Sequence, residues 1–147
     1  MKAFLFCYGT LLPEHAPPSV SNLIRKLRPI GPATVRGRLY NLGRYPGAIL
    51  DAGSSGHISG QVFALPADTD VLARLDEYEG FDPADPGDSL FVRQECRAAM
   101  LNGNIVKCWI YVYNRKIGSV RPVPGGRYSP KELKKTASHN SARDRRR

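Results

Sequence analysis

The chain has 147 residues, of which 41% are hydrophobic, and this length and composition suit one globular domain. More than half of its net charge of +9 lies in residues 131–147, which hold seven Lys or Arg and two Asp or Glu, so we expect a domain over residues 1–130 and a basic, disordered tail over residues 131–147. No aromatic residues alternate with the basic ones there, which disfavours a nucleic-acid partner, and no run approaches the ~18 apolar residues of a membrane span.

Cysteine and histidine spacing disfavours disulfide and metal sites. The three cysteines are an odd number without C-x-x-C spacing, and the three histidines lack a metal-binding spacing such as H-x-x-x-H, so we expect no metal and no other cofactor. The apolar start resembles a secretory leader, but no A-x-A-like cleavage site follows it. We therefore expect a soluble, cytoplasmic protein.

The first predicted element is a buried strand over residues 3–7 that runs directly into Tyr8-Gly9-Thr10-Leu11. Gly9 lets backbone N–H groups turn toward a bound anion at a place where a Cβ would clash, so this junction is a candidate ligand loop. The alternative is a tight turn that closes a core strand. Cys7 lies inside the apolar strand, where a small core residue is expected rather than a nucleophile paired with His15.

One short helix and three strands are predicted over residues 19–65. Ser19 or Ser21 could cap a helix over residues 22–27, which Pro29 would end. Residues 33–40 alternate in polarity, residues 48–50 are apolar, and residues 57–65 alternate again before Pro66. The Gly/Ser turn over residues 53–56 predicts a hairpin of the last two strands.

The second helix is predicted over residues 69–78, with Asp68 or Thr69 as its N-cap and Gly80 as its C-terminal stop. Strands over residues 90–101 and 105–114 follow, and the Asn102-Gly103 pair predicts that they form a hairpin. Residues 122–130 form a Gly/Pro-rich exit segment. About six strands and two helices indicate a small α+β fold whose largely antiparallel sheet curls around a core.

Glu79 lies on the apolar face of this second helix. At ~100° per residue, Glu79 lies about 80° from Val71, inside the apolar arc, whereas Glu77 faces solvent and Asp76 sits on the flank. Burial and the helix dipole should raise the pKa of Glu79 above the ~4.3 of free Glu, which suits proton transfer near neutral pH. Alternatively, Glu79 could fray outward or pair with Arg93.

Four segments occur in the order and at the spacing of a known family: Tyr8-Gly9-Thr10-Leu11, residues 42–48 (LGRYPGA), residues 75–81 (LDEYEGF) and residues 109–113 (WIYVY). Together they resemble the γ-glutamylcyclotransferase-like family, which includes the γ-glutamylamine cyclotransferases and the AIG2-like proteins. The resemblance covers residues 3–128.

This resemblance implies a small mixed, largely antiparallel β-barrel with flanking short helices. It also implies that Tyr8, Gly9, Thr10 and Leu11 hold the substrate and that Glu79 acts as general acid and base. Two further aromatic residues could close the pocket or donate a hydrogen bond, although packing alone would also explain them: Tyr45 and Tyr113.

The chain departs from the family pattern at two places. Where members often carry Tyr-x-Arg on the strand after the acid, it has Phe91-Val92-Arg93, and the closing Gly-Asp-Trp-like segment reads Gly126-Arg127-Tyr128. Both changes keep aromatic bulk but alter polar recognition, so they bear on substrate identity more than on fold.

The implied activity is the release of 5-oxoproline and a free amine from a γ-glutamyl amine or γ-glutamyl amino acid, by attack of the substrate's own amino group. No external nucleophile or metal is needed. The alternative is a non-catalytic AIG2-like module that binds a small ligand and contacts partners through its basic tail. The leaving amine and the oligomeric state stay open.

Overall fold

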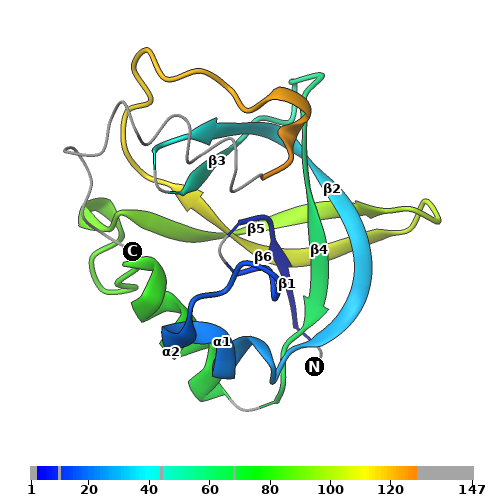
Figure 1. The fold of residues 1–147 in the computed structure, drawn as a ribbon, viewed down its shortest axis with the longest axis vertical. Helices are drawn as coiled ribbons and strands as arrows, with labels where there is room; N and C mark the ends of the chain where they lie inside the picture. Colours follow the sequence, from blue (N-terminus) through cyan, green and yellow to red (C-terminus); the bar gives the residue numbers. More distant parts are fainter. Residues whose placement is uncertain (1–2, 10, 44, 68, 129–147) are drawn as a thin grey trace.

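The computed structural model describes residues 3–9, 11–43, 45–67 and 69–128. Over these residues the chain forms six strands, two α-helices and two short 3₁₀ helices (Figure 1). In chain order they are β1 (Phe4–Cys7), α1 (Pro18–Ile24), β2 (Arg28–Asn41), β3 (Pro46–Leu50), β4 (His57–Ala64), α2 (Thr69–Glu79), η1 (Pro86–Asp88), β5 (Phe91–Met100), β6 (Ile105–Tyr113) and η2 (Pro124–Gly126).

Five of the strands close into a barrel. The sheet runs β3-β2-β4-β1-β6-β5, and a further pairing of β2 with β5 closes the ring, so that β3 is the extra strand. The pairing of β1 with β6 is parallel, with Leu5 opposite Trp109, whereas the other pairings are antiparallel. The prediction of a mixed, largely antiparallel barrel with short flanking helices is therefore confirmed.

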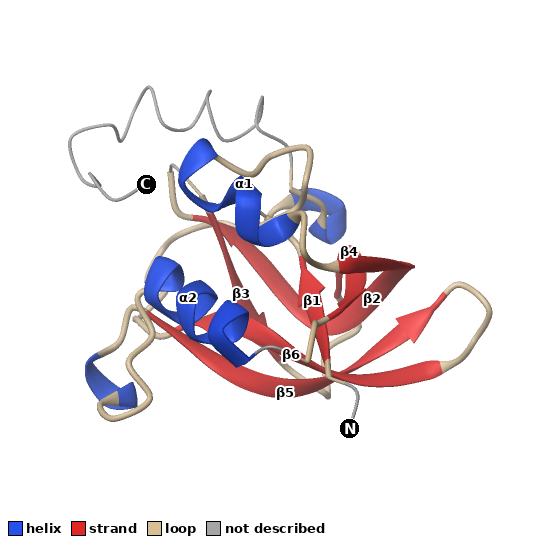
Figure 2. Cartoon of the chain, turned by 90° about the horizontal axis from the view of Figure 1, so that it is seen from below, coloured by secondary structure: helices blue, strands red, loops and turns tan. Residues whose placement is uncertain are grey.

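The core lies on both faces of β1. Leu5 and Cys7 belong to a cluster beneath the helices, whereas Phe6 and Tyr8 belong to a second cluster within the barrel. Because side chains alternate along a strand, a strand buried on both faces needs a continuous apolar run. Figure 2 shows α1 and α2 on the same side of the strands, where they cover the first cluster.

The predicted hairpin of residues 48–50 and 57–65 is wrong. Both segments pair with β2: β3 with Gly37–Asn41, and β4 with residues 28–36. The chain reverses between Asn41 and Pro46, where the Leu42 N–H donates to the Tyr45 carbonyl at 3.1 Å. Residues 51–56 do not reverse the chain, because β3 and β4 run head to tail along the same long partner strand.

The first helix lies earlier than predicted, and neither Ser19 nor Ser21 is its N-cap. Pro17 is the N-cap and Pro18 occupies the first turn, where its missing N–H costs nothing. The Ser21 hydroxyl donates to the Pro18 carbonyl from within the helix. Pro29 is not a stop signal here, since β2 already begins at Arg28 and carries a bulge after Pro29.

The later elements agree with the prediction. The helix of residues 69–79 extends one residue past the predicted end, and β5 and β6 pair as a hairpin. Asp68 and the tail over residues 131–147 lie outside the described residues. Within the described segments, neither helix combines the length and the apolar character that a membrane crossing requires.

Candidate functional site

The site begins with the way α2 ends. Gly80 has a φ of 75°, a conformation that favours glycine, and its N–H donates to the Glu77 carbonyl at 3.2 Å. The Phe81 N–H donates to the Asp76 carbonyl at 2.8 Å. These two bonds form a Schellman motif, which satisfies the terminal carbonyls and turns the chain directly after Glu79.

The helix buries two of its carboxylates. Glu79 is 4% exposed and Asp76 is 5% exposed, whereas Glu77 on the same turn is exposed. The prediction that Glu79 points inward is confirmed. Asp76, predicted on the flank of the helix, is more buried than that position suggests, because β5 and β6 also cover that side of the helix end.

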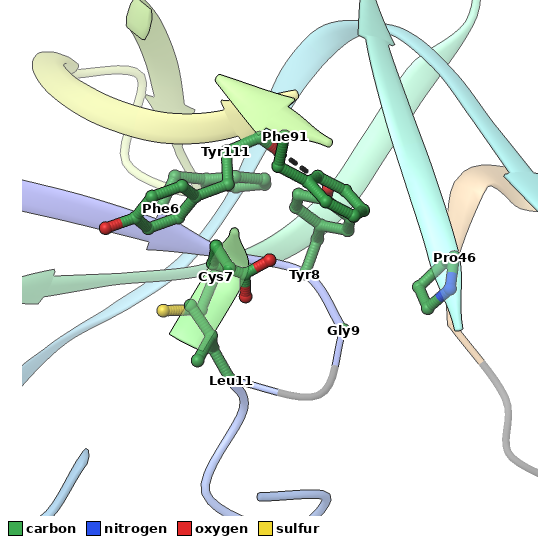
Figure 3. A pocket seen from close by; sticks show the side chains of 9 residues that line it. Phe6, Cys7, Tyr8, Gly9, Leu11, Pro46, Phe91 and Tyr111 are labelled. Carbon is green, nitrogen blue, oxygen red and sulfur yellow. Dashed lines mark hydrogen bonds between the residues drawn. The ribbon is translucent and has the colours of Figure 1, made fainter. Parts of the chain in front are cut away.

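Glu79 lines a cavity together with the bend that follows β1. Figure 3 shows this cavity, with Tyr8, Gly9 and Leu11 of the bend labelled. The space between the lining residues, including its open mouth, is about 310 Å³. Nine residues surround it: Phe6, Cys7, Tyr8, Gly9, Leu11, Pro46, Glu79, Phe91 and Tyr111. The structure thus brings four of the predicted site residues, Tyr8, Gly9, Leu11 and Glu79, to one cavity, while Thr10 lies outside the described residues.

Gly9 is closely covered by Pro46, the first residue of β3. A Cβ at this position would stand 2.8 Å from Cγ of Pro46, closer than van der Waals contact allows. Pro46 also lines the cavity, so a side chain at residue 9 would displace one of its walls.

The Tyr8 hydroxyl has structural partners. It donates to the Tyr111 carbonyl at 2.6 Å and accepts from the Ala48 N–H at 3.2 Å. It therefore ties the end of β1 to β6 and β3, and Figure 3 shows the bond to Tyr111 as a dashed line.

Tyr45 and Tyr113 stand behind the cavity wall instead of among the described residues that line it. Their rings pack against Phe91, with centroids at 5.8 and 5.6 Å. Phe91 itself lines the cavity at the position where the resemblance anticipated a tyrosine, so this part of the wall is apolar.

A buried polar network adjoins the cavity, and it was missed at the level of sequence. Arg93 binds Asp76 through two bonds, from Nε to Oδ1 at 2.8 Å and from Nη2 to Oδ2 at 3.1 Å. The Tyr111 hydroxyl donates to Oδ1 of the same carboxylate at 2.7 Å. Arg93, considered above as a partner for Glu79, therefore forms its ion pair with Asp76.

The Arg93 guanidinium also stacks on an aromatic ring, 4.4 Å from the centroid of Trp109. The one sequence signal for this network is Arg93, the third residue of the strand that follows the helix. Its partner could not be chosen between Asp76 and Glu79, because their relative burial depends on how the helix is rotated against the sheet.

The protonation of the cavity walls has clear causes. Burial raises the pKa of the Tyr111 hydroxyl well above its usual range, and the hydrogen bond to Asp76 raises it further. Burial also raises the pKa of the Cys7 thiol, with a smaller contribution from the Glu79 charge. Both groups are neutral at physiological pH, and a buried neutral thiol is a poor nucleophile.

A metal site finds no support in the part of the chain that the structure describes, where no group of three or more His, Cys, Asp or Glu side chains converges. The polar groups at the cavity are carboxylate, phenol, thiol and backbone. Such a set can move a proton and hold a small polar molecule.

Residues 5–130 match the family model described as gamma-glutamyl cyclotransferase, AIG2-like. None of the curated proteins compared with the chain matched it. Among solved structures, an AIG2-like protein from Mus musculus is 17% identical with a TM-score of 0.66, covering 87% of this chain and 88% of that one.

Two other solved structures have the same fold. A structure titled gamma-glutamyl cyclotransferase is 17% identical with a TM-score of 0.60, covering 97% of this chain and 82% of that one. YkqA from Bacillus subtilis is 23% identical with a TM-score of 0.64 over 87% of this chain, which spans only 40% of the YkqA chain.

Proposed function

Because the chain belongs to the gamma-glutamyl cyclotransferase, AIG2-like family, we propose that it releases 5-oxoproline and a free amine from a γ-glutamyl amine or γ-glutamyl amino acid. In this proposal, the reaction needs no metal or cofactor and takes place in the cytoplasm. One observation carries it: a buried carboxylate, Glu79, and the glycine bend at Gly9 line the same small cavity.

The reaction is intramolecular. The α-amino nitrogen of the substrate attacks its own γ-carbonyl carbon, a five-membered ring closes, and the bond from that carbon to the leaving nitrogen breaks. Well-aligned reactions of this kind reach effective molarities of ~10⁵–10⁸ M, so the enzyme mainly has to fold the substrate and exclude water. The apolar walls formed by Leu11 and Phe91 suit that task.

Glu79 carries the proton. Its carboxylate removes a proton from the attacking amine and returns it to the leaving nitrogen, a role typically worth ~10²–10⁴-fold. Cys7 and Tyr111, the titratable neighbours with raised pKa values, stay neutral and leave this exchange to the carboxylate. Backbone N–H groups of the bend after β1 hold the substrate α-carboxylate or the developing oxyanion.

The test is a screen for 5-oxoproline release from γ-glutamyl amines, γ-glutamyl dipeptides and glutathione. On the best substrate, Glu79→Gln should lower kcat by about 10²–10⁴-fold, because it keeps the shape and loses the proton carrier. Glu77→Gln, a change at the exposed acid on the same turn, should leave kcat unchanged. Full activity of Glu79→Gln would show that another group moves the proton.

A further inference from the structure

The buried pair of Asp76 and Arg93 lies one helical turn from Glu79. Residues three apart on a helix are neighbours on its surface, so Asp76 and Glu79 share a face. That face meets two strands, because Asp76 receives Arg93 from β5 and Tyr111 from β6. The side chain of Asp76 therefore ties the last turn of α2 to the barrel.

The tie is rigid. Arg93 approaches Asp76 through two parallel bonds, and its contacts with the rings of Trp109 and Phe81 fix the plane of the guanidinium. The side chains of Arg93 and Asp76 are only 16% and 7% exposed, so water does not compete for these bonds as it does at the surface.

The pair also places two opposite charges near Glu79. Asp76, three residues before Glu79 on the helix, carries a negative charge, and Arg93 pairs with it and carries the compensating positive charge. Among the described residues, the other titratable side chains that line the cavity with Glu79 are Cys7 of β1, Tyr8 directly after it and Tyr111 of β6. Helix α1, which packs on α2, carries no titratable side chain.

We propose that Asp76 and Arg93 are positioning residues that hold the end of α2 so that Glu79 faces the cavity, and whose opposite charges set the proton affinity of Glu79. The catalytic part of this inference rests on the proposed function. The electrostatic part does not, because charge coupling to Glu79 exists with or without a substrate.

The two charges act in opposite directions. Asp76→Asn keeps the shape but leaves the positive Arg93 alone, which favours the carboxylate form of Glu79. Arg93→Gln leaves the negative Asp76 alone, which favours the protonated form. We expect the titration midpoint of Glu79 to fall by about one pH unit in the first variant and to rise by about one in the second. A role confined to stability predicts no such opposition.

The experiment is ¹³C NMR of the full chain with glutamate labelled at the side-chain carboxyl, titrated with pH, the Glu79 signal being assigned by its loss in Glu79→Gln. Asp70→Asn and Arg74→Gln, at the exposed pair of the same helix, are matched controls that should leave the midpoint in place. Arg93→Lys keeps the charge, so it should keep the midpoint even where its geometry is poorer. Opposite shifts support the proposal; no shift, or shifts of one sign, overturn it.

Kinetics separate this proposal from the function. If 5-oxoproline is released, the acid limb of the kcat/KM profile should move with the NMR midpoint in each variant, and kcat should fall about 10–100-fold in Asp76→Asn, more than KM changes. If no substrate of the screen reacts, the proposed function fails, yet the NMR titration still decides whether the pair controls Glu79. If the acid limb of the kcat/KM profile stays fixed while the NMR midpoint of Glu79 moves, Glu79 does not carry the proton in the reaction.

Discussion

The two ends of α2 carry the same kind of ion pair in opposite surroundings. Near its start, Arg74 binds Asp70 at 3.1 Å with both side chains about two-thirds exposed, whereas near its end Arg93 binds Asp76 at 2.8 Å with both largely buried. The first pair links two residues of one helix, and the second joins the helix to the barrel. An Arg–Asp ion pair is therefore a surface feature near the start of α2 and part of the candidate site near its end.

Exposure to solvent determines how much each of the two ion pairs matters for stability. Water screens an exposed pair, and holding two long side chains in place costs entropy, so such pairs contribute about 0–1 kcal/mol. A buried charge without its partner is costly, so a buried pair must be kept complete. The third donor, Tyr111, completes the hydrogen bonding of the buried carboxylate.

Breaking the buried pair should have the largest effect on stability. Arg93→Met leaves the Asp76 charge buried without its cation, so we expect the free energy of unfolding to fall by about 3–5 kcal/mol. Urea denaturation followed by circular dichroism measures this. A loss below about 1 kcal/mol would mean that water reaches Asp76 and that the two ends of the helix are alike.

Removing the third donor should have an intermediate, pH-dependent effect. Tyr111→Phe deletes a hydrogen bond to a charged group, worth about 1.5–3 kcal/mol at neutral pH. Because folding raises the pKa of Tyr111, its contribution is complete below about pH 10, where the unfolded tyrosine begins to lose its proton, and declines above it by about 1.4 kcal/mol per pH unit. The unfolding free energies of parent and variant should converge from pH 10 upward, and a constant difference would contradict this account.

The exposed pair should respond least. Arg74→Met, matched to Arg93→Met, removes the cation from the pair with Asp70 and should change the unfolding free energy by no more than about 0.5 kcal/mol. That small change should shrink further in 0.5 M salt, because screening acts on exposed charges. An effect comparable with that of Arg93→Met would overturn the contrast between the two ends.

Sequence periodicity predicted the structural features that depend on residues close together along the chain. The inward direction of Glu79 follows from helix geometry once Val71 and Leu75 define the core face, and the stop at Gly80 follows from backbone freedom. The hairpin of β5 and β6 was similarly readable, because its Asn-Gly turn and its two strands are contiguous.

Features that depend on distant partners were not predictable in this way. The pairing of Asp76 with Arg93 and Tyr111 joins three elements, and no local pattern gives the rotation of α2 that selects Asp76 over Glu79. The turn at residues 53–56 looked like a reversal because its glycines and serines permit one, whereas the length of β2 decides that β3 and β4 follow each other along it. The family resemblance supplied the barrel, which periodicity alone left open.

The parallel pairing of β1 with β6 has a consequence for the order in which the molecule assembles. Residue 5 meets residue 109, so the barrel cannot close before most of the chain has left the ribosome, and the bend at Gly9 has no cavity to line until the last strand docks. Pairings so distant in sequence close large loops and slow the search for the native state. The candidate site is thus among the last parts of the protein to exist, and nascent or truncated chains that lack β6 should have neither the cavity nor a fixed carboxylate at residue 79.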